Sequence, residues 1–191
     1  MNAVILDGSL ENNKVPDTVR AALTDELAAD GWTVDTMVLR DLNIAYCVGC
    51  FECWVKTPGM CRFNDDGREV ARRFIQSDLV VFLTPVSFGG YSSALKRGLD
   101  RIICLISPFF KQVRGETHHR LRYNSYPRVL ALGTMPEADP ESERIFCRLV
   151  ERNAINVHSP GHAADVFVDN EETAAVRHRM HAMLDRIGVV S

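Results

Sequence analysis

The chain has 191 residues, of which 46% are hydrophobic and 25% charged, with a formal net charge of −3. This length and composition predict a single domain over residues 1–191 with a full apolar core, and they exclude disordered, collagen-like and coiled-coil proteins. The slightly negative charge argues against a nucleic-acid partner. The longest apolar runs are too short to cross a bilayer, which argues against a membrane partner.

Short apolar runs alternate with segments of helical periodicity along the whole chain. Strands are predicted at residues 2–6, 32–39, 79–83, 129–132 and 163–168. Helices are predicted at residues 15–29, 65–76, 92–104, 140–153 and 171–187. This alternation is typical of an α/β fold and predicts a doubly wound sheet of five parallel strands with helices on both faces.

Two segments interrupt this alternation. A Cys-rich loop covers about residues 40–64, and a stretch without a predicted element covers about residues 105–127. The second segment is too long for an ordinary connection between elements, so we interpret it as a functional insertion.

The loop after the first strand is a candidate phosphate site, because doubly wound sheets bind ligands outside the carboxyl ends of their strands. Backbone N–H groups of such a loop can cradle a phosphate, and Ser9, Asn13 and Lys14 would add donors and a counter-charge. The alternative is a polar turn that only caps the following helix.

The loop after the third strand combines glycines, small hydroxyls and aromatic side chains. This composition favours a planar ring lying along the backbone, with the ring site formed by Pro85, Val86, Ser87, Phe88, Gly89 and Gly90. Three residues after the fourth strand, Gly133, Thr134 and Met135, would close the far side of the ring. The alternative places the aromatic side chains in the core and uses the serines as helix caps.

Four cysteines of the Cys-rich loop form the sharpest pattern in the sequence. Cys47, Cys50 and Cys53 are spaced by three residues, and Cys61 follows eight positions later. Thiolates at this spacing favour an iron–sulfur cluster or zinc, although free thiols or a redox-active pair would fit the same pattern. A chain with no signal peptide is expected in the reducing cytoplasm, where such thiols are seldom a disulfide framework.

The insertion carries polar, basic and aromatic residues. Arg114, Arg120 and Arg122 could attract the phosphates of NAD(P)H or an anionic acceptor, but a solvated lid or a subunit contact is the favoured interpretation. Phe109 and Phe110 are predicted to form an interface patch because they belong to no predicted element.

Three segments resemble the flavodoxin-like NAD(P)H-dependent FMN reductases: Gly8-Ser9, residues 85–89, and residues 95–101, which read Leu-Lys-Arg-Gly-Leu-Asp-Arg. The resemblance implies the strand order 2-1-3-4-5, an FMN phosphate on the first loop and the flavin ring on the third. Leu10 stands where that family usually has Arg. The cysteine run resembles the compact motif of the iron–sulfur flavoproteins, a branch of this family, which implies a 4Fe-4S cluster held by Cys47, Cys50, Cys53 and Cys61.

The expected function is therefore that of an FMN-dependent oxidoreductase. Hydride would pass from NAD(P)H to the flavin and on to a small-molecule electron acceptor such as a quinone or a free flavin, in a cytoplasmic homo-oligomer (dimer or tetramer). One alternative is an iron–sulfur flavoprotein that carries single electrons between protein partners. The other is a non-enzymatic flavodoxin-like protein that binds zinc or senses oxidants through its thiols.

Overall fold

The computed structural model describes residues 1–113 and 115–190, so Arg114 lies outside the described residues. Five parallel strands form the central sheet, in the spatial order β2 (Thr33–Val38), β1 (Asn2–Asp7), β3 (Leu79–Ser87), β7 (Arg128–Met135) and β8 (His162–Val168). This is the order 2-1-3-4-5 of the parallel strands in chain sequence, which confirms the predicted flavodoxin-like doubly wound fold.

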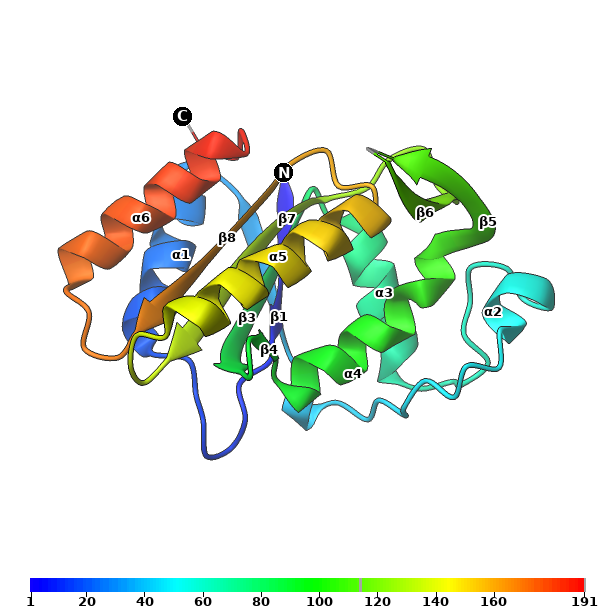
Figure 1. The fold of residues 1–191 in the computed structure, drawn as a ribbon, viewed down its shortest axis with the longest axis horizontal. Helices are drawn as coiled ribbons and strands as arrows, with labels where there is room; N and C mark the ends of the chain where they lie inside the picture. The colour runs from blue at the N-terminus through cyan, green and yellow to red at the C-terminus, as the bar shows by residue number, and fades with distance from the viewer. Residues whose placement is uncertain (114, 191) are drawn as a thin grey trace.

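Helices cover both faces of the sheet (Figure 1). One core cluster lies under α1 (Asp17–Ala29) and α6 (Thr173–Arg186). The other lies under α3 (Asp66–Gln76), α4 (Ser93–Arg101) and α5 (Pro140–Asn156). In the part of the chain that the structure describes, no helix has the length and apolar composition needed to cross a membrane.

The central strand β3 shows why the sheet is continuous and apolar. Its side chains alternate between the two clusters, with Val80 and Phe82 facing α3 and α4, and Val81 and Leu83 facing α1 and α6. A parallel strand covered on both faces is buried on both sides, so an unbroken apolar run is its expected sequence signature.

Two strands extend beyond their predicted ends, and this changes the loops at the carboxyl edge. Strand β3 continues to Ser87 and turns back into the short strand β4 (Gly90–Tyr91), and β7 continues to Met135. The predicted loop after the third strand is therefore a β-hairpin, and residues 133–135 lie in a strand rather than in a loop.

The segment at residues 105–127 is more regular than predicted. A 3-10 turn, η2 (Ile102–Leu105), leads into a hairpin of β5 (Ile106–Val113) and β6 (Glu116–Leu121). Phe109 and Phe110 thus belong to a strand, contrary to the prediction, and both are exposed. This hairpin was not predicted because its residues show no regular apolar alternation. The hairpin packs mainly on α5 and η2.

The Cys-rich loop is largely irregular. It contains the 3-10 turn η1 (Leu39–Asp41) and one helical turn, α2 (Glu52–Val55), which lies at the end of the molecule farthest from α6 (Figure 1). The indole N–H of Trp54 in α2 donates to the carbonyl oxygens of Ile103 and Ile106, both at 3.1 Å. The loop is thereby attached to the base of the β5–β6 hairpin.

Candidate functional site

The loop after β1 is held closely against the start of α4. The Gly8 N–H donates to the Leu83 carbonyl oxygen at 2.7 Å, and the Ser92 hydroxyl donates to the Gly8 carbonyl oxygen at 2.6 Å. A Cβ atom at Gly8 would lie 2.7 Å from both Leu95 Cβ and Ser92 Oγ. Only glycine fits here, and the two predicted ligand loops are joined through the N-cap of α4.

The predicted phosphate donors differ in their surroundings. Ser9 is buried, and its hydroxyl oxygen accepts a hydrogen bond from the Val15 N–H at 3.2 Å, so it shapes the loop from inside. Asn13 and Lys14 are exposed, and the backbone of Asn13 pairs with that of Leu10 in a short turn. These two residues are the ones whose side chains are accessible to an anion.

The same edge carries two arginines that the sequence analysis missed. Arg20 of α1 forms a 2.9 Å ion pair with the buried Asp7, and Arg40 donates to the Ser9 carbonyl oxygen at 3.4 Å. Arg40 lies in η1, two residues after the end of strand β2, which pairs with β1, so the strand order was the signal that could have identified it. Arg40 and Lys14 thus place positive charge near the loop, whereas the charge of Arg20 is compensated by Asp7.

The turn of the β3–β4 hairpin presents one aromatic side chain to solvent. Phe88 and Gly89 have φ angles of +49° and +70°, the pattern of a type I′ turn, and the turn packs against Ile145 of α5. The Phe88 side chain is 100% exposed. A positive φ is unfavourable for a large side chain, and exposure of an apolar ring to water is unfavourable as well. Residues held in such unfavourable conformations cluster at binding sites.

The other predicted ring residues lie around this turn. Val86 and Gly90 are half-buried and Ser87 is exposed, whereas Pro85 is buried in β3. Gly133, Thr134 and Met135 are all buried in β7. A Cβ atom at Gly133 would lie 2.6 Å from Val86 Cγ2, so this glycine makes room for the neighbouring strand.

The four cysteines of the Cys-rich loop line one small cavity. Its other walls include Arg62, Phe63 and Arg101. Cys53 is buried, Cys61 half-buried, and Cys47 and Cys50 exposed. Burial raises the pKa of the Cys53 thiol, and the nearby thiolates of Cys61, Cys47 and Cys50 raise it further.

None of the four thiols forms a disulfide bond. Among residues 1–113 and 115–190, no three His, Cys, Asp or Glu side chains are arranged to hold a single metal ion. The cavity is nevertheless shared by four soft ligands, the donor type that iron–sulfur clusters require.

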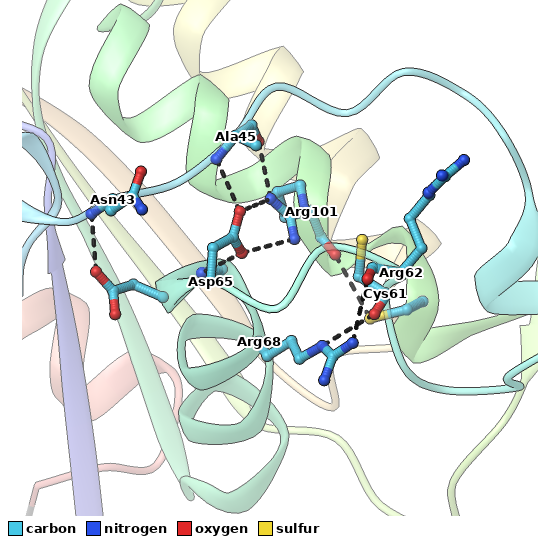
Figure 2. A network of polar contacts seen from close by, with 10 residues as sticks. Asn43, Ala45, Cys61, Arg62, Asp65, Arg68 and Arg101 are labelled. Carbon is cyan, nitrogen blue, oxygen red and sulfur yellow. Dashed lines mark hydrogen bonds and ion pairs between the residues drawn. The ribbon is translucent and has the colours of Figure 1, made fainter.

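Arg101, one of the residues that line this cavity, forms a buried ion pair with Asp65 (Figure 2). The guanidinium of Arg101 donates to both carboxylate oxygens of Asp65, each at 2.8 Å, and to the Ala45 carbonyl oxygen at 2.8 Å. Burial raises the pKa of the Asp65 carboxyl, but hydrogen bonds from Arg101, Ala45 and Gly67 outweigh burial and place this pKa below its usual value. Asp65 lies where a helix was predicted to begin, and its carboxylate also caps α3 by accepting a hydrogen bond from the Gly67 N–H.

A second cavity of about 440 Å³ lies between α4, α5 and the β5–β6 hairpin. Its lining is mainly apolar, and it extends from Gly90 of the β3–β4 hairpin to His119. The His119 ring contacts the exposed Phe110 at a centroid distance of 4.7 Å and Trp54 at 5.1 Å. Its neighbour His118 is buried and bonds to Glu116, so the two histidines do not meet at one centre.

The chain is similar in sequence to known flavoproteins. A model of the NADPH-dependent FMN reductase family matches residues 1–121. An iron–sulfur flavoprotein of Methanocaldococcus jannaschii is 35% identical over 83 residues, which cover 44% of this chain and 42% of that protein. An iron–sulfur flavoprotein of Archaeoglobus fulgidus is 30% identical over 103 residues, which cover 54% of this chain and 46% of that protein. Each match spans less than half of the relative's length.

The fold itself has solved counterparts. The structure of an NAD(P)H:quinone oxidoreductase from Methanothermobacter marburgensis superimposes with a TM-score of 0.68 and 15% sequence identity, covering 95% of this chain and 96% of that one. At this identity the likeness establishes the flavodoxin-like fold.

Proposed function

Because this chain belongs to the NADPH-dependent FMN reductase family, we propose that it is an FMN-dependent NAD(P)H oxidoreductase acting on a small-molecule electron acceptor. The observation that carries the proposal is the carboxyl edge of the sheet, where the Gly8 loop and the β3–β4 turn are joined through Ser92. Flavodoxin-like sheets bind their ligands at this edge.

The residues at this edge fit FMN in both charge and shape. Asn13, Lys14 and Arg40 would hold the phosphate, aided by the first N–H groups of α1, which no side chain in the described structure caps. Ser9 would keep the loop in shape through its bond to Val15.

The β3–β4 turn would hold the ring. Phe88 provides an exposed aromatic face, and Gly90 allows the ring to approach the backbone, whereas the predicted Gly89 is buried against Ile145 and would shape the turn. Val86 and Ser87 would continue this surface, with the buried Pro85, Gly133, Thr134 and Met135 supporting it from β3 and β7. When bound, FMN would supply a ring that accepts hydride from NAD(P)H and passes the electrons on to the acceptor.

The test is FMN titration followed by flavin fluorescence, with Phe88→Ala and Lys14→Ala as variants. We expect Phe88→Ala to weaken FMN and riboflavin binding alike, because ring contacts are common to both ligands. Lys14→Ala should weaken FMN binding only, because riboflavin has no phosphate. Tyr46→Phe, at an exposed position in the Cys-rich loop, is the control. Undiminished binding by Phe88→Ala would exclude the turn as the ring site.

A second candidate function is that of an iron–sulfur flavoprotein carrying single electrons between protein partners. The shared cavity of Cys47, Cys50, Cys53 and Cys61 favours it, because four thiolates are the usual ligands of a 4Fe-4S cluster. A reducing cytoplasmic location would keep these thiols available. Iron and acid-labile sulfide analysis after anaerobic purification tests this candidate, and their absence after reconstitution would exclude it.

A homo-oligomer is the proposed assembly. The exposed Phe109 and Phe110 lie beside the apolar cavity between α4 and α5, and a second copy would cover this surface. Light scattering on Phe110→Glu is the test, with a loss of oligomer expected and an unchanged mass contradicting the proposal.

A further inference from the structure

Arg101 is a buried cation with one nitrogen atom, Nε, that forms no hydrogen bond within the described part of the chain. Its side chain is only 1% exposed, which is rare for arginine unless the charge is compensated. Asp65 and the Ala45 carbonyl oxygen satisfy the two terminal nitrogens. The Nε–H group is buried and has no hydrogen-bond partner among the described residues. Buried polar groups without a partner are uncommon, so this donor requires an explanation.

Arg101 lies on the wall of the four-cysteine cavity. Burial lowers the pKa of its guanidinium, but hydrogen bonding to Asp65 and the charge of the nearby Cys61 thiolate outweigh burial, so this pKa lies above its usual value. The Arg101 guanidinium also lies over the Phe63 ring, 5.3 Å from its centroid. The guanidinium is therefore held rigidly, next to a predicted cluster ligand.

The local sequence leaves space for this arrangement. Gly67 lies in the first turn of α3, and a Cβ atom there would be 2.9 Å from Arg101 Cζ. Glycine is unfavourable within a helix, so its presence is consistent with a requirement for the guanidinium at this point.

We propose that Arg101, oriented by Asp65, is a positioning residue that donates its free Nε–H toward the sulfur atoms of a cluster in the four-cysteine cavity and thereby raises the reduction potential of that cluster. The inference rests on the proposed cluster. A 4Fe-4S cluster gains one electron on reduction and becomes one unit more negative, with no change in its ligands. Hydrogen bonds to cluster sulfurs and nearby positive charge stabilise the reduced form, which shifts the potential upward.

Arg62 provides the matched comparison. It lines the same cavity and carries the same charge, but its side chain is 49% exposed and it bonds to Glu52. Solvent screens an exposed charge, so its influence on the cavity is weaker than that of a buried one.

The experiment uses full-length protein, purified anaerobically and reconstituted with iron, sulfide and FMN. The midpoint potential is read from the electron paramagnetic resonance signal of the reduced cluster, which is separate from the flavin absorbance. We expect R101Q to shift the potential to more negative values, R101K to shift it less because the charge remains, and R62Q to shift it least. Circular dichroism verifies the fold of each variant, and R101K is the decisive variant if R101Q does not fold or retain iron.

Each result bears on the inference. An R101Q potential equal to that of the unaltered protein would overturn it, as would a shift in R62Q as large as that in R101Q. An R101K potential unchanged from that of the unaltered protein would overturn it where R101Q cannot be measured. If the unaltered protein takes up no iron, both the cluster and this role of Arg101 are excluded, whereas FMN titration tests the oxidoreductase proposal independently.

Discussion

At the scale of single residues, the surroundings of each cysteine decide its chemistry. Cys47 and Cys50 are exposed in an irregular loop, whereas Cys104 is buried among apolar side chains. Burial raises the pKa of the Cys104 thiol to about 12, with the Cys53 and Cys61 thiolates contributing. The thiolate is the reactive form, so identical side chains differ greatly in reactivity.

Alkylation of the metal-free protein should therefore be selective. With iodoacetamide at pH 8, we expect Cys47 and Cys50 to react and Cys104 to remain unmodified until the protein unfolds. Peptide mass spectrometry over time measures the order of modification. Labelling of Cys104 at the rate of Cys47 would contradict the buried position of its side chain.

Gly8 is a second position where a single residue is decisive. The Gly8→Ala variant places a methyl group 2.7 Å from Leu95 Cβ and Ser92 Oγ, so we expect a loss of about 1–3 kcal/mol in the free energy of unfolding. Urea denaturation is the measurement. Gly161→Ala is the matched control, because its nearest neighbour would be at an ordinary 3.6 Å, and it should leave stability nearly unchanged. Equal stabilities of the two variants would refute the close approach.

At the scale of elements, the Asp65–Arg101 pair fastens the Cys-rich loop to two helices. Asp65 caps the start of α3, Arg101 ends α4, and both bond to Ala45 within the loop. One ion pair thus positions the backbone that leads to the cysteines. Figure 2 shows how the carboxylate of Asp65 lies between Arg101 and the Ala45 N–H.

This pair predicts an acid-sensitive contribution to stability. The pKa of folded Asp65 lies below its unfolded value, near 3.8, so its stabilisation is fully present above that pH and is lost as the pH falls through the folded value. Asp65→Asn leaves Arg101 buried without its counter-charge and should cost about 3–5 kcal/mol at pH 7. The difference between this variant and the unaltered protein should shrink below about pH 3.8.

Urea denaturation at a series of pH values measures both effects. Asp41→Asn is the control, since Asp41 is exposed and lies 3.5 Å from Arg40, an arrangement worth little in water. A difference that is independent of pH would show that the carboxylate charge of Asp65 does not stabilise the fold.

At the scale of the whole molecule, the two core clusters share one sheet. Strand β3 contributes side chains to both clusters, and β1 and β7 do the same. Residues of both clusters therefore lose their support together if the sheet opens. The proposed FMN site depends on the same sheet, because its loops follow β1 and β3.

Unfolding should therefore be a single cooperative transition, as predicted for one domain over residues 1–191. FMN at about 100 times its dissociation constant should raise the free energy of unfolding by about 2.7 kcal/mol, because it binds only the folded form. Far-ultraviolet circular dichroism and tryptophan fluorescence monitor the transition, and riboflavin is the comparison ligand. Separate transitions by the two probes would contradict a single domain.

The amino-acid sequence was sufficient to predict the strand order and the helices, and it led to the hypothesis that the four cysteines bind a cluster. Alternating apolar runs and helical periodicity are local signals, and the Gly8-Ser9 and residue 85–89 motifs identified the family. The spacing of Cys47, Cys50 and Cys53 was likewise visible along the chain.

Contacts between residues far apart in the sequence became visible only in the folded structure. The β5–β6 hairpin escaped prediction because its stability comes from packing on α5 and η2. Arg40 meets the Ser9 loop, and Arg101 meets both Asp65 and the cysteine cavity, across 31 and 36 residues of sequence. Such contacts depend on how strands and helices pack, since a buried charge is stable only where the fold brings its partner within hydrogen-bonding distance.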